Sequence, residues 1–387
     1  MPVPRTRCCS LAALFLALLL AAAPTRAQED TSTVAPARPD VDLALGGTLQ
    51  PRFSYGRTFV TAGPGADAPD RVGFGIRRAR LRFEATLAGR TGVYVQLAAG
   101  GTTVGLLDAL LFYDLPDALR LRLGRLAAAQ PRAAQLTSHK HIDLTARPAI
   151  ARRWGDATLG NSGRDFGLEA LYETDRVTAQ AGLYNGNGNW SRALGNFRED
   201  ITGDPTGGLA TRGLSVAAYG AWRPAALEGV EVGGFIGRNA ARNAASTPPP
   251  NRFSDGARSY TSYSGHLYWG PRPGSQPVRL EADLIGTRYE TLSAGNGAFD
   301  QHALGASLLG AVGLFDQSAE LLARVERYDP ALDRDDDAVD YVSAGASLSA
   351  SAPRGRPYER QRLTLAYSTR LNDADPHLLV VQAQVLF

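Results

Sequence analysis

The segment His377–Phe387 reads HLLVVQAQVLF, and the sequence ends on its phenylalanine. Counting back from Phe387, every second residue is apolar, whereas the alternate positions include Gln382 and Gln384. Two residues is the period at which side chains return to the same face of a β-strand. The pattern therefore predicts a strand with one apolar face and one polar face, and it places the two glutamines on the polar face.

The amino-terminus has the layout of an export signal. Arg5 and Arg7 precede an apolar run at 11–23, and a small-residue site ends at Ala27. The run is shorter than a membrane-spanning helix, which favours a cleaved signal peptide over residues 1–27 rather than a retained anchor. Residues 28–40, rich in Thr, Pro and Ala, are expected to be a flexible leader. Cleavage would remove both cysteines, so a mature chain without disulfides is expected.

The formal net charge of +3 arises in the expected signal segment, which holds Arg5, Arg7 and Arg26 and no acidic residue. The chain from residue 28 onward is therefore neutral overall, so its charge gives no indication of a nucleic-acid partner. No stretch in that part approaches the length of consecutive apolar residues that a helical membrane span needs, which excludes such spans.

Alternating segments recur from Val41 to the end of the sequence. In 78–87 one face carries Ala, Leu, Phe, Ala and Leu, while the other carries three arginines; 119–123, 278–284 and 319–325 repeat the pattern. Each segment is near the length of a tilted membrane strand, and about sixteen such strands are expected. Their expected first residues are 41, 74, 92, 106, 119, 164, 176, 211, 229, 258, 277, 301, 317, 339, 358 and 377.

The connections between these segments are alternately short and long. Short turns are expected at 89–91, 115–117, 174–175, 271–276 and 315–316, and long connections at 56–73, 127–163, 186–210, 239–256, 291–300 and 329–338. This alternation is typical of outer-membrane barrels, whose turns lie on one side of the bilayer and whose loops lie on the other. The short connection at 100–105 departs from the alternation.

The last strand also resembles the terminal strand by which bacterial outer-membrane barrels are recognised for assembly. We therefore expect Phe387 to act as an assembly signal for the barrel assembly machinery. We expect the last strand to pair with 41–55, because that pairing removes the last free sheet edge. Leu379, Val381 and Val385 should then face the outer-membrane lipid.

A soluble β-sandwich is the alternative that alternation alone leaves open. A sandwich must bury its apolar face, yet several of these strands carry clustered charge opposite that face. The expected signal peptide and the alternation of short and long connections also argue against a soluble sandwich. Together they favour an all-β, transmembrane antiparallel barrel over residues 41–387, located in the bacterial outer membrane.

Several motifs, in a consistent order, resemble the phosphate-selective porin O and P family. They are IRRARLRFEATLAG, VYVQLAAG, LLDALLFYDLP, LRLRLGRL, LTSHKHIDLTARP, GRDFGLEALYE, AGLYNGNG and AELLARVERYD, and they cover nearly the whole expected mature chain. The resemblance implies a homotrimeric, water-filled channel of about sixteen strands, with the long third loop at 127–163 folded inward. It also implies a ladder of arginines that lines the lumen and attracts small anions.

The candidates for lining the pore and binding anions are Arg78, Arg80, Arg82, Arg120, Arg122, Arg132 and Lys140. The strand arginines lie opposite an apolar face, and a charge facing lipid would cost about 2–4 kcal/mol at the midplane, so we expect them to face the lumen or an interface. Rings of arginine favour anions, and guanidinium groups suit phosphate oxygens. The alternative is that they pair with Glu84, Asp108 and Asp114, which would leave little net field. The family also uses a lysine cluster, whereas Lys140 is the one lysine here, so anion preference is better supported than phosphate specificity.

No other chemistry has a complete motif. His139 and His141 could share a face, but no cysteine or nearby acid pair completes a metal site. Asp333–Asp337 lacks the glycine and the distal glutamate of an EF-hand loop, and the sequence has no GxSxG elbow. We therefore expect a passive channel without cofactor or enzymatic activity. A non-selective porin, a barrel hydrolase and an outer-membrane anchor or adhesin are the alternatives.

Overall fold

A computed structural model describes residues 41–56, 71–100, 103–158, 163–185, 214–239, 258–291, 300–332, 338–371 and 377–387. The expected signal peptide at 1–27 and leader at 28–40 lie outside these ranges, as does the acidic segment Asp333–Asp337. What the sequence predicts for those segments stays a prediction.

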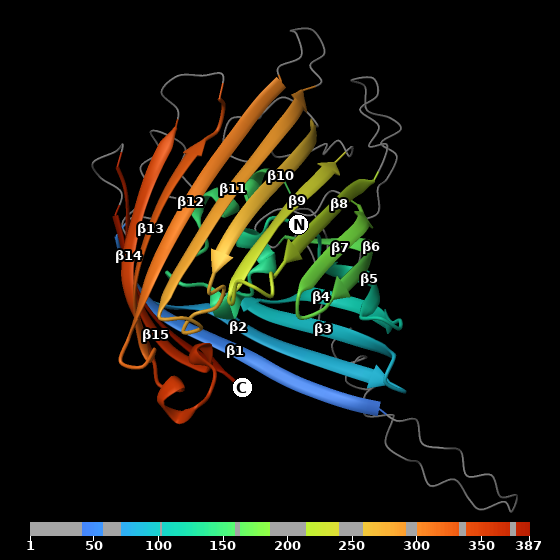
Figure 1. Cartoon of the computed structure of the whole chain (residues 1–387), viewed down its shortest axis with the longest axis horizontal. Helices are drawn as coiled ribbons and strands as arrows, with labels where there is room; N and C mark the ends of the chain where they lie inside the picture. Colours follow the sequence, from blue (N-terminus) through green and yellow to red (C-terminus); the bar gives the residue numbers. More distant parts are fainter. Residues whose placement is uncertain are drawn as a thin grey trace, which may run out of the picture. The chain divides into compact units, whose positions relative to one another are not determined.

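Sixteen strands form a closed antiparallel barrel (Figure 1). They are β1 (Val41–Gly56), β2 (Arg71–Leu87), β3 (Thr91–Gly100), β4 (Thr103–Asp114), β5 (Leu119–Ala127), β6 (Arg164–Glu173), β7 (Val177–Tyr184), β8 (Ser215–Trp222), β9 (Val230–Asn239), β10 (Arg258–Trp269), β11 (Val278–Thr291), β12 (Asp300–Leu314), β13 (Ala319–Asp329), β14 (Val339–Ser349), β15 (Gln361–Arg370) and β16 (His377–Leu386). Each strand pairs with its neighbours in sequence, and β1 closes the barrel against β16. The predicted barrel of about sixteen strands is confirmed, and the expected strand starts lie within four residues of those observed.

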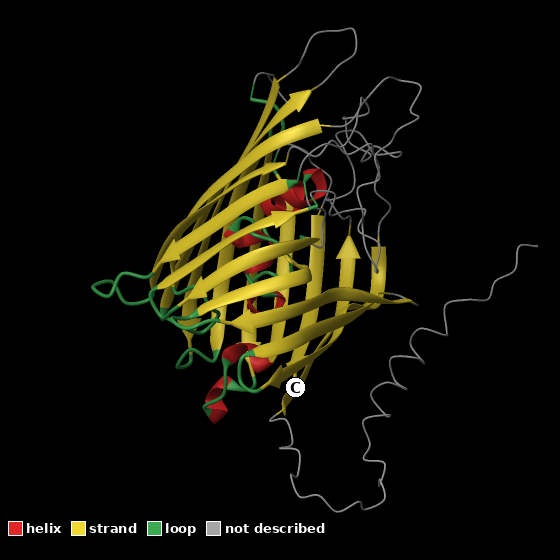
Figure 2. Cartoon of the chain, turned by 90° about the vertical axis from the view of Figure 1, so that its right-hand side faces the viewer, coloured by secondary structure: helices red, strands yellow, loops and turns green. Residues whose placement is uncertain are grey.

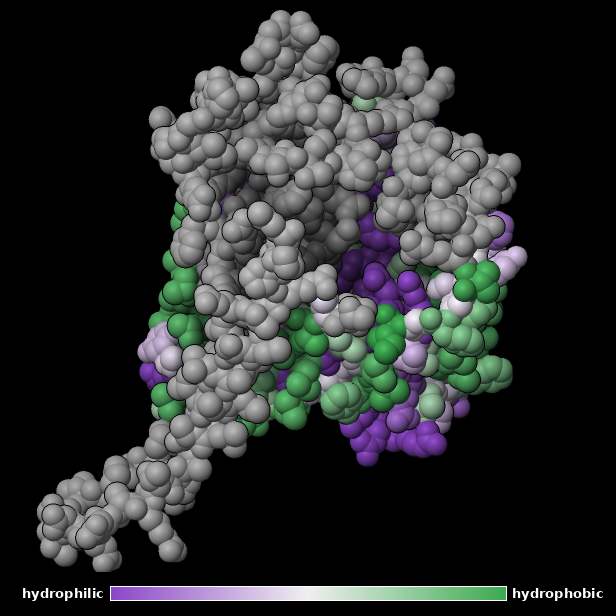
Figure 3. Space-filling model, turned by 180° about the vertical axis from the view of Figure 1, so that it is seen from behind, coloured by the Kyte–Doolittle hydropathy of each residue, from purple (hydrophilic) through white to green (hydrophobic). Residues whose placement is uncertain are grey.

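The alternation of the sequence separates the two faces of the wall. Outward side chains are large and apolar, and the extreme case, Phe74, is 91% exposed. In β16, Val385 is exposed, whereas Gln382 and Gln384 are buried inside, as the two-residue period predicts. Figure 3 shows apolar residues, in green, on the sides of the barrel and hydrophilic residues, in purple, at its lower end. Such an exterior is the one that a transmembrane barrel presents to lipid.

The seam between β1 and β16 is closed by the last residue of the sequence. The N–H of Gly47 donates to the carbonyl of Phe387 at 2.9 Å, and the N–H of Phe387 donates to the carbonyl of Gly47 at 3.3 Å. A Cβ atom added at Gly47 would lie 2.1 Å from the Phe387 ring, so the ring lies directly over this glycine. Any larger residue at position 47 would displace the ring from the seam.

Among the described residues, helical segments occur in two of the connections. The connection between β5 and β6 holds η1 (Arg132–Leu136), η2 (His139–His141) and α2 (Ala149–Ala157), and the one between β14 and β15 holds η4 (Ala352–Arg354) and η5 (Tyr358–Arg360). Figure 2 shows helices inside the barrel and at one end of it.

The strand expected from residue 358 begins at Gln361, because Tyr358 is buried in η5 and its hydroxyl lies 2.6 Å from Ser347 Oγ. None of the helices in the described ranges is both long and apolar enough to cross a bilayer.

Candidate pore lining

The described residues of the third loop, 128–158 and 163, contact the inner faces of β13 and β16. Gln384 of β16 donates to the carbonyl of Lys140 at 3.1 Å, and Arg324 of β13 donates to the carbonyl of Ala146 at 3.1 Å. Both strand side chains are buried and lie on the face opposite the exposed apolar residues. The third loop is therefore folded into the barrel, where its side chains meet those of the wall.

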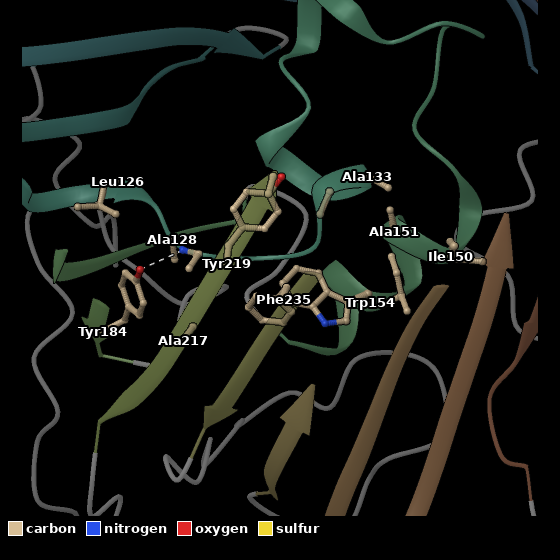
Figure 4. Packing of buried hydrophobic residues seen from close by; sticks show 14 residues of the cluster. Leu126, Ala128, Ala133, Ile150, Ala151, Trp154, Tyr184, Ala217, Tyr219 and Phe235 are labelled. Carbon is tan, nitrogen blue, oxygen red and sulfur yellow. Dashed lines mark hydrogen bonds between the residues drawn. The ribbon is translucent and has the colours of Figure 1, made fainter. Parts of the chain in front are cut away.

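Apolar contacts hold one end of this loop against β9 and β12. The indole of Trp154 in α2 packs edge-on against the Phe235 ring, with 5.8 Å between the ring centroids (Figure 4). Ile150 lies over Gly305, where an added Cβ would come within 2.6 Å of its Cγ2 atom. Burying side chains of this size contributes about 1.5–3 kcal/mol each, so this packing anchors α2 to the wall.

A buried carboxylate accepts hydrogen bonds from the first turn of α2. The helix follows Pro148, and the N–H groups of Ala149 and Ile150 donate to Oε2 of Glu326, the second at 3.4 Å. The other oxygen of Glu326 accepts a hydrogen bond from Arg324 Nε at 2.8 Å. The first N–H groups of a helix have no partner within the helix, and a carboxylate there also meets the positive end of the helix dipole.

Two buried arginines on the inner face of the wall from β9 to β13, called here the paired wall, contact carboxylates: Arg279 and Arg324. The guanidinium of Arg279 is fully buried, donates from Nε to Glu320 Oε1 at 2.8 Å and forms an ion pair with Asp143 of the third loop. Arg132 of the third loop donates from Nε to Glu231 Oε1 of β9 at 2.8 Å. Positive and negative charges are therefore matched at short range on this side.

The wall formed by β1 and β2 presents arginines whose hydrogen-bond partners are neutral. Arg78 Nη1 donates to Gln50 Oε1 at 2.9 Å, and Arg80 Nη1 lies 3.0 Å from Nδ1 of His139 in the third loop. The other ring nitrogen of His139, Nε2, lies 2.9 Å from Thr48 Oγ1. Because arginine only donates, Nδ1 must accept, and the neutral tautomer with its proton on Nε2 satisfies both contacts.

The environment of His139 keeps its imidazole uncharged. Burial, together with the positive charges of Arg80 and Arg78, lowers the pKa of His139 to about 2. The histidine thus occupies the position next to Arg80 without contributing a charge of either sign.

A third guanidinium joins this group from the loop. Arg147 is buried and donates to the carbonyl of Ala133 at 3.3 Å and to Gln135 Oε1 at 3.2 Å. Burial lowers the pKa of Arg147, and nearby Arg164 and Arg80 lower it further. Within the described ranges, no carboxylate forms an ion pair with Arg78, Arg80 or Arg147. These three arginines, together with His139, are called here the cationic cluster.

Three of the other sequence candidates, Arg120, Arg122 and Arg132, have carboxylate partners. Arg120 donates to Asp114 from Nε at 2.5 Å and from Nη2 at 2.8 Å, which is one of the pairings that the alternative interpretation predicted. Arg122 pairs with Glu169, and Arg132 pairs with Glu231 as described above. Their charges are therefore matched by partners.

Asp108, an expected partner of the candidate arginines, instead contacts Arg164, which approaches its Oδ1 at 2.9 Å. The side chain of Arg82 lies over Gly46 of β1, since a Cβ there would be 2.5 Å from Arg82 Nε. Lys140 is half-buried in η2. No group of three or more His, Cys, Asp or Glu side chains in the described part of the chain is arranged to hold a metal ion.

The connection between β14 and β15 meets the tip of the third loop. His141 Nε2 lies 3.2 Å from Glu359 Oε1, and Gln384 Nε2 donates to the Glu359 carbonyl at 2.5 Å. The connection between β14 and β15 lies at the end of the barrel where the short turns are. The third loop is therefore supported from that end of the barrel as well as by the wall.

A closed sixteen-strand barrel with an apolar exterior, a charged interior and a long third loop folded inside has the architecture of a porin-type barrel. The structure is similar to that of OmpF from Salmonella typhi, with a TM-score of 0.58 and 12% identity over 89% of this chain and 97% of that chain. It is similar to the outer membrane channel DcaP of Acinetobacter baumannii, with a TM-score of 0.58 and 11% identity over 90% and 97% of the two chains.

It is also similar to OmpT of Vibrio cholerae in its trimer form, with a TM-score of 0.56 and 11% identity over 90% and 99% of the two chains. No family model and no curated protein sequence matches the chain. At these identities the likeness shows the fold alone, so function must be argued from the residues in the lumen.

Proposed function

We propose that the protein is an outer-membrane channel through which small hydrophilic solutes diffuse passively, and that it favours anions. The observation that carries the proposal is the cationic cluster, where three arginines have neutral hydrogen-bond partners. The arginines of the paired wall, by contrast, contact carboxylates. A group of uncompensated guanidinium ions beside a water-filled passage lowers the energy of an anion there and raises that of a cation.

The fold supports the passive part of this proposal. Barrels of this strand number are wide enough to leave an aqueous channel, which an inward loop then narrows. The predicted export signal at 1–27, the location in the outer membrane and recognition of Phe387 by the barrel assembly machinery belong to the same proposal. So does a homotrimer, for which the support is the motif resemblance and the trimer form of one similar structure.

Phosphate is the anion that the motif resemblance favours, and guanidinium groups bind its oxygens in pairs. The lumen described here offers arginine rather than lysine for that purpose, because Lys140 is the single lysine. Phosphate preference is therefore proposed as a finer property of an anion-preferring pore. A non-selective porin is the second candidate, and the Arg120–Asp114 and Arg122–Glu169 pairs favour it, because they cancel charges that the sequence assigned to the pore.

Planar-bilayer recording of purified protein tests the proposal. The reversal potential in a KCl gradient should show anion preference, and Arg78→Gln/Arg80→Gln should reduce the anion-to-cation permeability ratio by about fivefold for each charge, the factor that corresponds to about 1 kcal/mol. Arg327→Gln is the matched control, because it removes the same charge from an exposed residue of β13 that pairs with Asp340. An unchanged ratio in the double variant would leave the non-selective porin as the better assignment.

Adding phosphate at constant ionic strength distinguishes phosphate preference from general anion preference. A phosphate-preferring pore should show reduced chloride current as phosphate rises, and the reduction should disappear in the double variant. Anion preference without that reduction would support the general anion channel and contradict phosphate preference.

A further inference from the structure

The connection between β14 and β15 presents positive charge at the end of the barrel where the short turns are. It is the longest of the described connections at this end, and Figure 1 shows it in red, close to the label C. Three of its residues are exposed arginines: Arg354, Arg356 and Arg360. Its one acidic residue, Glu359, contacts His141 of the third loop, with 3.2 Å between Oε1 and Nε2. In the described part of the chain, no carboxylate forms an ion pair with any of the three arginines.

The three arginines line a cleft of about 400 Å³ together with Ser351 and Gln361. A hydrogen bond across the connection fixes its shape, because Ser351 Oγ donates to the carbonyl of Pro357 at 2.7 Å. Gly355 has a φ of +65°, and this left-handed conformation, which glycine adopts without steric cost, turns the chain between two of the arginines. The cleft is therefore part of a folded turn. The three arginines, Ser351 and Gln361 are called here the basic cleft.

The basic cleft opens on the outer side of the wall. Gln361, which lines it, is the first residue of β15, where exposed and buried residues alternate. It therefore shares a face with the exposed Leu363, whereas Arg362 between them is buried inside the barrel. In the strand register, Leu363 is opposite Leu348 of β14, which is exposed as well. An outward apolar pair thus borders the cleft on the side of the strands, and the proposed channel function does not account for the cleft.

The basic cleft also lies at the level of lipid headgroups. Trp222 and Trp269 face outward at the ends of β8 and β10, and the exposed Phe315 follows the end of β12. Aromatic residues concentrate where lipid tails meet headgroups, so these strand ends mark that boundary. The N–H of Ser349, at the end of β14, donates to the carbonyl of Ser318 at 2.7 Å, which places this strand end beside the turn that holds Phe315. The arginines follow Ser349 in sequence and therefore lie beyond the boundary, among headgroups.

We propose that the basic cleft binds the phosphate group of an anionic phospholipid in the membrane leaflet on the short-turn side. Guanidinium groups match phosphate oxygens in pairs, and a group of basic residues at a membrane surface attracts anionic lipid. The acyl chains lie along Leu348 and Leu363, which border the cleft. An acidic peptide would also meet the arginines, but it has no acyl chains to cover that apolar pair. The inference goes beyond the proposed channel function and shares with it only the location in a membrane.

Lipid retention by the purified full-length barrel tests this proposal. The barrel is mixed with equal amounts of phosphatidylglycerol and phosphatidylcholine that carry the same acyl chains, and bound lipids are counted by native mass spectrometry. The wild type should retain phosphatidylglycerol preferentially, and Arg356→Gln/Arg360→Gln should weaken that binding by about fivefold for each arginine. Arg90→Gln/Arg176→Gln is the matched control, because it removes two exposed arginines from short turns at the same end of the barrel. The control should retain phosphatidylglycerol like the wild type.

A second variant keeps the test decisive if the double variant fails to fold. Gln361→Glu places a carboxylate of nearly the same size in the cleft while keeping every arginine, and it should also reduce phosphatidylglycerol retention. Neither inorganic phosphate nor a glutamate-rich peptide at the lipid concentration should displace the lipid, because both lack acyl chains. Unchanged retention in either cleft variant, equal loss in the control, or displacement by phosphate or peptide would overturn the proposal.

Planar-bilayer recording of the same variants separates this site from the pore. Arg356→Gln/Arg360→Gln should leave the reversal potential at its wild-type value, because the basic cleft opens outside the wall. A change in ion selectivity equal to that of Arg78→Gln/Arg80→Gln would assign these arginines to the conduction path and would overturn the lipid assignment. Reduced lipid retention with unchanged selectivity would support the lipid site whether or not the wild-type pore prefers anions.

Discussion

Arginines contact the third loop from two parts of the barrel wall, the paired wall and the wall formed by β1 and β2, but their partners differ. On the paired wall, Arg279 contacts Asp143 and Glu320, so its charge is balanced within the protein. In the cationic cluster, Arg78 contacts the amide of Gln50, and Arg80 contacts an imidazole. The first arrangement ties the loop to the wall, because neither partner can leave without exposing an unpaired buried charge. In the second, no carboxylate of the described ranges forms an ion pair with Arg78 or Arg80.

Position in the lumen does not by itself make an arginine part of a selectivity site. The charge of a guanidinium reaches a permeating ion only when no carboxylate lies against it. The neutral partners of the cationic cluster hold the side chains in place through hydrogen bonds, and in the described part of the chain they bring no opposite charge into direct contact with them.

Removing the central arginine of the paired wall should have the largest effect. Arg279→Gln would leave Asp143 and Glu320 buried without their counter-ion, and we expect a loss of about 3–5 kcal/mol in the free energy of unfolding. Denaturant titration followed by tryptophan fluorescence measures this. Arg327→Gln, whose side chain is 66% exposed, should change stability by less than about 1 kcal/mol.

A second variant tests whether unpaired buried carboxylates cause this loss of stability. Arg279→Gln/Asp143→Asn removes one of the stranded carboxylates along with the arginine and should recover part of the lost stability. No recovery would show that packing of the arginine stem, rather than unpaired charge, accounts for the loss.

Acid should weaken the docking of the third loop through His139. Its pKa is about 2 in the folded state against an ordinary 6.5, so the undocked loop binds one more proton throughout that interval. A group with a depressed pKa of this kind favours the docked state above pH 6.5, and the benefit falls by up to about 1.4 kcal/mol per pH unit below it.

Protease sensitivity of the third loop between pH 7 and pH 5 measures this effect. The wild type should become more sensitive as the pH falls, and His139→Gln, which has no titrating group, should show a weaker dependence. Parallel pH profiles for the two proteins would contradict the assignment.

Giving the cationic cluster a carboxylate should make it resemble the paired wall. His139→Glu places a negative charge next to Arg80 without removing any arginine, and we expect the anion-to-cation permeability ratio to fall by about fivefold. His139→Gln keeps a neutral partner at the same place and should keep the ratio. If both variants behave alike, the shape of the third loop rather than its charge sets the selectivity.

The sequence predicted the barrel well because the relevant signal is local. A two-residue period is set by strand geometry, and it placed Arg78 and Arg80 on the inner face without any knowledge of the neighbouring strands. The pairing of Arg120 with Asp114 could also be predicted from the sequence. A tight turn joins β4 to β5 and makes these two residues direct register partners. Short connections of this kind leave few alternative registers.

The sequence could not predict which residues form the cationic cluster, because the cluster depends on contacts between residues that are distant in sequence. Arg147 and His139 lie on a long loop whose path depends on contacts with strands far away in sequence, such as that of Ile150 with Gly305. Arg122 and Glu169 are register partners too, but the third loop separates their strands, so the pairing could not be read from spacing. The one usable local signal was Pro148 ahead of a helix-forming run, which precedes α2.

The smallest effect is expected where a candidate arginine already has a carboxylate beside it at the surface. Arg120 and Asp114 are 36% and 32% exposed, and pairs of this kind contribute about 0–1 kcal/mol. Arg120→Gln should therefore change the free energy of unfolding by less than about 1 kcal/mol and leave the reversal potential nearly unchanged. If instead it shifted selectivity as strongly as Arg78→Gln/Arg80→Gln, paired arginines would contribute to the lumenal field after all. The distinction between the two walls would then lie in depth along the pore rather than in the partners of the arginines.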